Sequence, residues 1–455
     1  MKQGKILVYA LLSFSFLFFH GHEIRDVRPN VLFIMVDDLG VDGISIYGSK
    51  VDTPNIDALA KSNGVMVSHC FAQPNCTPSR VKLMTGMRTY KSYDRFAYLN
   101  PEHKTIGNLM KEAGYKTCIA GKWQLNGNPR MSGYVEEHNH KDRAYQAGFD
   151  EYHLHNYTFS EGKRYADSEI ESNGKRLKGE YGPDMHRDFI IDFIRRNKQQ
   201  PFFIYYPMVL VHGAYDKTPD SEDWHQTDKN KSSNEYLVDM IRYTDKIVGQ
   251  LVETLKRENL YENTIIIFTS DNGTGRGGTI NTVGGFVRGG KGTMKDAGTR
   301  VPLIIHNSQK IEEFKRWKGL IDFSDFYPTF ADIAGIDLGN EKNLDGISFY
   351  PLVSGDADIF KYREILFMHH DPRRDDNQNR IRTDSENRNR FARTIEYKLY
   401  QTGEFYHVDK DPLEEDAIDI DSLDEQMLEI YKKLKSELDR IDREYPWEDI
   451  WPSGN

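Results

Sequence analysis

Continuous apolar runs alternate with amphipathic segments over most of the chain. Residues 30–36, 264–269 and 301–306 are almost wholly apolar. Short runs without polar alternation are typical of strands buried on both faces of a parallel sheet. The patterns over 184–196 and 233–257 predict helices. Strands that alternate with helices predict an α/β fold, with a large mixed, mostly parallel sheet sandwiched by helices.

The pattern changes after Leu352. Residues 361–389 are rich in charge and asparagine. Residues 393–400 and 404–408 predict two antiparallel strands, and 422–443 predict an amphipathic helix. We therefore expect a catalytic domain over 23–355 and a smaller α+β subdomain over 356–455.

The first residues resemble an export signal. Lys2 and Lys5 precede an apolar run over 6–19, and polar residues follow at once. This pattern predicts a signal peptide over 1–22 and a secreted or periplasmic protein, with no stable membrane insertion after cleavage. The run is short for a membrane span, although an N-terminal anchor is the alternative.

Charge and cysteine content narrow the function. The formal net charge is −10, which argues against general nucleic-acid binding. The three cysteines, Cys70, Cys76 and Cys118, are too few for a disulfide framework. If chemistry consumes Cys76, then Cys70 and Cys118 could pair, and two buried free thiols are the alternative.

Acidic pairs follow two of the predicted strands. Asp37 and Asp38 follow one strand, and Asp271 and Asn272 follow another. Ligands bind at the carboxyl ends of strands in open α/β sheets. Four oxygen-bearing side chains there predict a calcium cage, since no histidine or cysteine accompanies the pairs. The alternative is that they are turn and cap residues.

One cysteine and several basic residues are candidates for a reactive thiol and an anion-binding site. In Cys76-Thr-Pro-Ser-Arg80, the cysteine is expected at a helix N-terminus, in a positive field, with Arg80 one turn further on. The alternative is a buried structural cysteine. Lys122, His212 and Lys291, with Arg300, could surround a tetrahedral anion, or they could be solvated.

The order of these motifs resembles that of the type I (formylglycine-dependent) sulfatases of the alkaline phosphatase superfamily, over nearly all of the mature chain. The segments that carry the resemblance are 30–40, Cys76–Arg80 (the Cys-x-Pro-x-Arg signature), 83–86, 121–127, 270–273, 291–302, 345–348, 405–408 and 411–412. The resemblance implies an alkaline phosphatase-like fold and a sulfuric ester hydrolase. It also implies a formylglycine (3-oxoalanine) made from Cys76 by a formylglycine-generating or sulfatase-maturating enzyme.

The resemblance assigns roles residue by residue. Asp37, Asp38, Asp271 and Asn272 would hold Ca²⁺, which formylglycine 76 would also touch. Arg80 and Lys122 would steady the formylglycine, Lys122 and Lys291 would bind sulfate oxygens, and His212 would lie near the leaving-group oxygen. Gln124 stands where the family usually has histidine. It can contact substrate but cannot take up a proton, so His212, Asp37 or water would serve as base for sulfate release.

The substrate and some residues stay open. Secretion and many aromatic residues favour a sulfated carbohydrate as substrate, with glycan degradation as the role. The alternatives are a phosphodiesterase or phosphonate hydrolase of the same superfamily, and a non-catalytic calcium-bearing glycan-binding protein. The histidines at 138, 140, 153 and 155 could contact substrate or be solvated loop residues, and the second interpretation is favoured. His369 and His370 could reach over the pocket or face water, and Trp224 could be a sugar platform or core.

Overall fold

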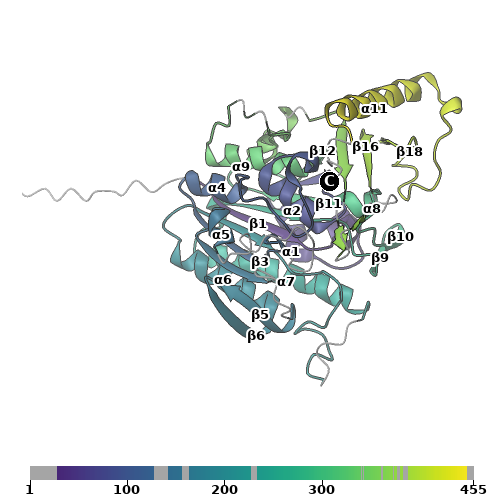
Figure 1. Ribbon diagram of the computed structural model, residues 1–455. Coiled ribbons are helices and arrows are strands. Elements are labelled where there is room, and N and C mark those ends of the chain that lie inside the picture. Colours follow the sequence, from purple (N-terminus) through teal and green to yellow (C-terminus); the bar gives the residue numbers. More distant parts are fainter. Residues whose placement is uncertain are drawn as a thin grey trace, which may run out of the picture.

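A ten-stranded sheet forms the centre of the protein, in the order β12-β2-β11-β8-β1-β7-β3-β4-β5-β6 (Figure 1). The computed structural model describes residues 28–127, 142–155, 163–226, 233–339, 341, 343–359, 362–371, 374–376, 380–382 and 388–447. The predicted signal peptide over 1–22 lies outside this range. In spatial order the strands are β12 (Lys315–Asp322), β2 (Gly64–Phe71), β11 (Arg300–His306), β8 (Thr264–Ser270), β1 (Asn30–Val36), β7 (Phe202–Pro207), β3 (Lys116–Lys122), β4 (Glu151–His155), β5 (Ala166–Ser172) and β6 (Lys175–Tyr181).

The sheet is mixed and mostly parallel, which confirms the predicted fold class. β1 runs parallel to both of its neighbours, β7 and β8, and β3 runs parallel to β7 and β4. β11 runs antiparallel to β2 and β8, and β5 runs antiparallel to β4 and β6.

β1 is apolar after Asn30 because both faces of the sheet are covered. Val31, Phe33 and Met35 join the core on one face, whereas Leu32 and Ile34 join the core on the other. All five are 0% exposed. Burial of each such side chain is worth about 1.5–3 kcal/mol, so this strand anchors the residues that follow it.

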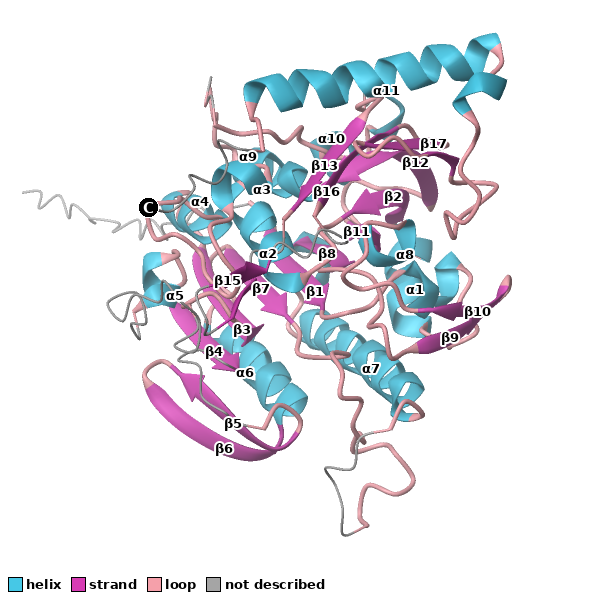
Figure 2. Cartoon of the chain, turned by 45° about the vertical axis from the view of Figure 1, so that its right-hand side comes forward, coloured by secondary structure: helices cyan, strands magenta, loops and turns pink. Residues whose placement is uncertain are grey.

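Helices cover both faces of the sheet (Figures 1 and 2). Apolar side chains of α2 (Cys76–Thr85), α4 (Ile106–Glu112) and α9 (Phe326–Ala334) pack on one face. Those of α1 (Pro54–Lys61), α6 (Gly182–Arg196) and α7 (Tyr236–Arg257) pack on the other. No described helix combines the length and apolarity that a bilayer crossing requires.

The C-terminal part contains a second, antiparallel sheet beneath α11 (Glu425–Glu444). Its strands are β13 (Leu366–His370), β16 (Asn389–Arg393), β17 (Tyr397–Tyr400) and β18 (Phe405–His407). Leu434, Leu438 and Ile441 of α11 pack against this sheet. The domain boundary at 355/356 stays a prediction.

The remaining elements are short. They are the helices α3 (Thr89–Ser92), α5 (Arg143–Gln146), α8 (Asp296–Thr299) and α10 (Tyr350–Val353), and two antiparallel strand pairs, β9 (Thr279–Thr282) with β10 (Gly285–Arg288) and β14 (Arg374–Asp376) with β15 (Arg380–Arg382).

One strand of the predicted C-terminal pair is wrong in its extent. The expected strand over 393–400 is interrupted, because the backbone N–H of Thr394 donates to the carbonyl of Tyr397 at 2.9 Å. The Thr394 hydroxyl also accepts from the N–H of Tyr397 at 3.0 Å. This turn ends β16 at Arg393 and starts β17 at Tyr397.

Cys70 and Cys118 are buried free thiols. They lie in β2 and β3, with β11, β8, β1 and β7 between them. At about 4.8 Å per strand, the two strands are roughly 24 Å apart, far beyond the reach of a disulfide. Burial raises the pKa of both thiols well above its usual range, so both stay protonated.

Candidate active site

Adjacent strand ends bring the predicted polar residues together. Asp37 and Asp38 follow β1, Asp271 and Asn272 follow β8, and Lys122 is the last residue of β3. β8, β1, β7 and β3 are consecutive in the sheet, so their carboxyl ends meet at one edge. All five side chains are buried, with at most 2% of the residue exposed. Polar groups buried this deeply require partners, and most of them find these partners within the cluster.

Lys122 and Arg80 neutralise two of the carboxylates. Lys122 Nζ donates to both oxygens of Asp37, at 2.9 and 2.8 Å. Arg80 donates from Nε and Nη2 to Asp271 Oδ2, at 3.1 and 2.8 Å. Its Nη1 donates to the carbonyl of Lys122 at 3.2 Å. Arg80 therefore ties α2 to the ends of β8 and β3.

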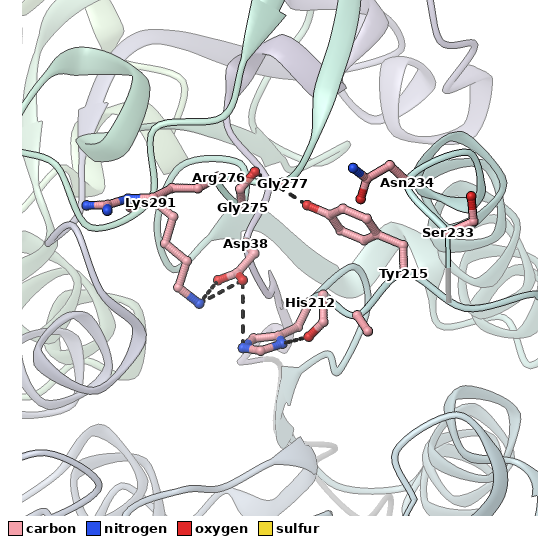
Figure 3. Close-up of a pocket in the computed structure, with 11 residues that line it drawn as sticks. Asp38, His212, Tyr215, Ser233, Asn234, Gly275, Arg276, Gly277 and Lys291 are labelled. Carbon is pink, nitrogen blue, oxygen red and sulfur yellow. Dashed lines mark hydrogen bonds and ion pairs between the residues drawn. The ribbon is translucent and has the colours of Figure 1, made fainter. Parts of the chain in front are cut away.

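Asp38 is held by a separate set of groups. Lys291 Nζ lies 2.6 Å from Oδ1 and 2.7 Å from Oδ2 of Asp38 (Figure 3). Asn272 Nδ2 donates to Asp38 Oδ1 at 2.9 Å, and His212 Nε2 lies 3.7 Å from Oδ2. The N–H of Asp38 donates to Asp271 Oδ1 at 3.1 Å. Asp38 therefore contacts residues from three separate parts of the chain.

Two predicted site residues have left-handed backbone. The φ angle is 64° at Asp38 and 53° at Gln124. Such conformations cost residues other than glycine about 1–3 kcal/mol, and they gather at functional sites where the surroundings hold them. At Asp38 the hydrogen bonds to Asp271, Asn272 and Lys291 supply that support.

Burial and the surrounding charges shift the pKa values of the buried carboxylates in opposite directions. Burial favours a high pKa for Asp37, but the positive charges of Lys122 and Arg80 oppose it, and the pKa is lowered. For Asp271, burial and then the negative charge of Asp37 raise the pKa, although Arg80 opposes them. Carboxylates held this close compete for protons unless further positive charge is supplied.

His212 is electrically neutral near pH 7. Burial lowers its pKa to about 3, and Lys122 and Arg164 act in the same direction against Asp37. A neutral ring can donate one N–H or offer one nitrogen as a ligand. Ligand atoms of Asp37, Asp38 and His212 all lie within 4.8 Å of one another. The expectation that no histidine accompanies the carboxylates is therefore wrong.

The side-chain oxygen of Asn272 is available as a ligand for a cation. Asn272 is fully buried, and its Oδ1 has no hydrogen-bond partner among the described residues, although its Nδ2 has two acceptors. Leaving a buried amide oxygen unpaired costs about 1–3 kcal/mol. An amide oxygen among three carboxylates is a ligand set that fits a hard cation such as Ca²⁺, and an imidazole nitrogen beside it would also suit a softer metal.

Cys76 is the first residue of α2 and faces this cluster. Every residue of α2 is buried, which fixes the helix on all sides, and Cys76 itself is 3% exposed. Its thiol donates to Gln124 Oε1 at 3.4 Å. Cys76 also interacts electrostatically with Arg80 and Lys291. The structure thus brings Cys76, Arg80, Gln124 and Lys291 together.

The sequence pattern does not indicate Arg164 as a neighbour of the site, and it leaves the position of His370 open. Arg164 contacts the ring of His212 and donates to the carbonyl of Gly213 at 3.4 Å. His370 is buried in β13 and lies 3.2 Å from the side chain of Asn75, next to Cys76. The pair His369-His370 was the only signal for the second contact, and it left the direction of the side chains open.

Other predicted residues lie elsewhere. His153 and His155 are not solvated: both are buried in β4, and His153 Nδ1 lies 2.9 Å from His186 Nδ1. The histidines at 138 and 140 lie outside the described residues. Trp224 packs edge-on against Tyr181 and is core. Arg300 donates to the carbonyl of Ser68 on β2 and does not join Lys122 and Lys291.

A cavity of about 580 Å³ opens beside Asp38 (Figure 3). Its lining residues are Asp38, His212, Gly213, Ala214, Tyr215, Ser233, Asn234, Gly275, Arg276, Gly277 and Lys291. The polar cluster is therefore reachable by a small molecule.

Known proteins are similar to this chain in sequence and in architecture. A sulfatase family model matches residues 29–336, and a model for the C-terminal part of N-sulphoglucosamine sulphohydrolase matches 288–444. N-acetylgalactosamine-6-sulfatase of Canis lupus familiaris is 29% identical, over 75% of this chain and 69% of that protein. Arylsulfatase J of Mus musculus is 26% identical over 72% of this chain, which spans only 56% of that protein. The crystal structure of Ps i-CgsB in complex with k-i-k-neocarrahexaose has a TM-score of 0.71 and 25% identity, and it covers 94% of each chain.

Proposed function

The chain belongs to the sulfatase family and is a sulfuric ester hydrolase, and from this premise we propose that it releases sulfate from a carbohydrate. The observation that carries the proposal is the convergence of Cys76, three buried carboxylates and three basic side chains beside one cavity. A carbohydrate substrate is supported by the relative named N-acetylgalactosamine-6-sulfatase and by the neighbour solved with a neocarrahexaose. The predicted signal peptide further suggests a secreted or periplasmic enzyme.

We assign the nucleophile to residue 76 and the metal to the carboxylate cluster. A formylglycine hydrate, made from Cys76 by a maturating enzyme, would supply a hydroxyl nucleophile in place of the thiol. Ca²⁺ held by Asp37, Asp38, Asp271 and Asn272 would act as a Lewis acid toward the sulfate.

The other side chains have roles that follow from their positions. Lys122 and Lys291, now paired with Asp37 and Asp38, would bind sulfate oxygens and stabilise the charge of the transition state. Gln124 would hold the group at position 76 by hydrogen bonds. His212, being neutral, would donate an N–H to the leaving oxygen.

The charge balance of the site favours an anionic substrate. Three carboxylates and three basic groups cancel, so a divalent cation would leave an excess of two positive charges. A sulfate monoester carries one negative charge and would be attracted to this excess. A phosphodiester carries the same charge, so it must be tested directly as the competing substrate.

Peptide mass spectrometry and a substrate panel test the proposal. Protein expressed with a maturating enzyme should give a peptide around residue 76 that lacks the thiol sulfur and contains an aldehyde. The same protein should release sulfate from sulfated sugars and from 4-nitrophenyl sulfate faster than it cleaves bis(4-nitrophenyl) phosphate. An unmodified thiol in active protein, or preferred cleavage of the phosphodiester, would contradict the proposal.

Calcium should stabilise the fold as well as support catalysis. After treatment with a chelator, Ca²⁺ at about 100 times its Kd should raise the Tm by about 3 °C, because the ion binds only the folded cluster. The Asp38→Asn variant should lose most of this shift. Asp42→Asn is the matched control, since Asp42 accepts from the Thr274 hydroxyl and lies outside the cluster. A shift that Asp38→Asn leaves intact would place the ion elsewhere.

A further inference from the structure

We propose that Arg276 binds a second anionic group of the substrate, so that the enzyme prefers sugars with a further sulfate or carboxylate beside the ester that it cleaves. This inference rests on the proposed function, because it assumes that the first sulfate lies against Lys291. It assigns a specificity role to a residue that the predicted catalytic set does not include.

Arg276 is held next to Lys291 at the mouth of the cavity. Its Nε donates to the carbonyl of Lys291 at 2.7 Å, and its Nη2 donates to the carbonyl of Gly292 at 3.2 Å. Both residues line the same cavity, and Figure 3 shows their side chains on the same side of Asp38. The guanidinium is therefore oriented before any ligand arrives, which lowers the entropy cost of binding.

The glycines around Arg276 pack closely against their neighbours. A Cβ on Gly275 would lie 2.7 Å from the hydroxyl of Tyr215, and one on Gly278 would lie 2.7 Å from Leu237. A Cβ on Gly289 would lie 2.2 Å from the carbonyl of Gly275. The backbone is thus packed too closely for side chains at these glycines, while Arg276 is exposed.

The charge of Arg276 is not balanced by an acidic partner. In the described part of the chain, neither Arg276 nor Arg288 forms an ion pair with a carboxylate, and both are exposed. Arg288 Nε lies 3.4 Å from the carbonyl of Arg276, which keeps the two arginines adjacent. In a chain of net charge −10, such a local excess of positive charge attracts an anion.

The opposite wall of the cavity carries neutral polar side chains in place of basic ones. Tyr215, Ser233 and Asn234 lie across from Arg276 and Lys291 in Figure 3, and all three are neutral hydrogen-bonding side chains. Sugar hydroxyls suit this wall, whereas a second anionic group suits the basic wall. The arrangement therefore predicts which side of the sugar carries the additional charge.

Paired substrates test this role. N-acetylgalactosamine and glucosamine would each be assayed as the 6-sulfate and as the disulfate, with 4-nitrophenyl sulfate as a singly charged reference. A 6-sulfated sugar with and without a linked hexuronic acid would distinguish a carboxylate from a second sulfate. The quantity compared is the ratio of kcat/KM for the doubly and singly charged member of each pair.

In the wild-type enzyme we expect this ratio to exceed ten in at least one pair and to fall as salt is added. Arg276→Gln should lower the ratio about tenfold, since a charged hydrogen bond is lost, and Arg276→Lys should retain part of it. Arg257→Gln is the matched control, because Arg257 ends α7, roughly 30 Å along the helix from Tyr236, and should leave the ratio unchanged.

The possible outcomes distinguish failure of the Arg276 proposal from failure of the proposed sulfatase function. If Arg276 only holds the backbone at Lys291 and Gly292 in place, Arg276→Gln should lower kcat/KM equally for both members of a pair. That result would overturn the specificity role. A wild-type ratio near one in every pair overturns it as well. Failure of the wild-type enzyme to release sulfate from any of these substrates would overturn the proposed function together with the role of Arg276.

Discussion

Replacing Cys76 with alanine should abolish sulfate release, with kcat reduced on the order of 10⁵-fold or more, as loss of a nucleophile does in other hydrolases. The variant cannot form an aldehyde at this position, whereas the carboxylates and basic groups stay in place. Removal of one buried sulfur atom should cost only about 1–2 kcal/mol of stability. Sulfate release measured by ion chromatography, together with thermal unfolding, would separate lost chemistry from lost folding.

Cys118→Ala is the matched control for this experiment. Cys118 is also a buried free thiol, and it lies four residues before Lys122 on β3, roughly 13 Å from the strand end. Its replacement should cost similar stability and leave sulfate release nearly intact. Activity of Cys76→Ala within a hundredfold of the wild type would exclude residue 76 as nucleophile and would favour direct attack by water.

The sequence was sufficient for residues that directly follow buried strands. β1 is apolar from Val31 onward and the centre of β8 is apolar because helices cover both faces of the sheet, so both strands could be located from hydrophobicity alone. Asp37 and Asp271 then follow at fixed positions, and parallel pairing of β1 with β8 places them at one edge. The oxygen-rich part of the site was therefore predictable.

The position of His212 depends on the path of a loop. Beyond β1, the N–H of Asp37 donates to the carbonyl of Leu210, and the N–H of Val211 donates to the carbonyl of Asp37, both at 2.8 Å. These two bonds carry the loop after β7 alongside Asp37 and bring His212 to Asp38. Hydrophobic periodicity carries no information about such a pairing, so the contact of His212 with the carboxylates was not foreseen.

The sequence pattern also did not predict the polar pairs that are buried in the core. β4 reads Glu-Tyr-His-Leu-His, which is short and polar, yet His153 and His155 are each 3% exposed. Burial of His153 depends on His186, which is distant in sequence and lies in α6. Similarly, Lys398 and Glu414 are buried as an ion pair at 2.8 Å, and nothing local in the sequence indicates that either has a partner.

Lys122→Met should impair both stability and catalysis. Asp37 is fully buried and receives two hydrogen bonds from Lys122, and its next cation is Arg80 Nη2, 3.6 Å from Oδ1. Breaking one side of a buried ion pair should lower the free energy of unfolding by about 3–5 kcal/mol. Loss of a positive charge that faces the sulfate should also lower kcat by about 10²–10³-fold.

The stability that Lys122→Met loses should depend on pH, because the substitution changes the pKa of Asp37. In the wild type that pKa is lowered, so the carboxylate stabilises the fold above about pH 4, its unfolded pKa, and this contribution is lost at lower pH. Without Lys122, burial should raise the folded pKa above the unfolded value. The variant should then regain stability as pH falls through its raised pKa, so the difference from the wild type should shrink between pH 7.5 and pH 5.

Lys116→Met on the same strand is the control for this prediction. Lys116 begins β3, at the opposite end from Lys122, and its ammonium lies 3.5 Å from Asp150 with 32% of the side chain exposed. Loss of an exposed pair of this kind should cost less than about 1 kcal/mol and should show no such pH dependence. Denaturant unfolding of both variants over the pH range, with activity assayed well below the Tm, tests the role of the buried pair. Equal stability of the two variants at pH 7.5 would mean that Arg80 or a bound cation already neutralises Asp37 without Lys122.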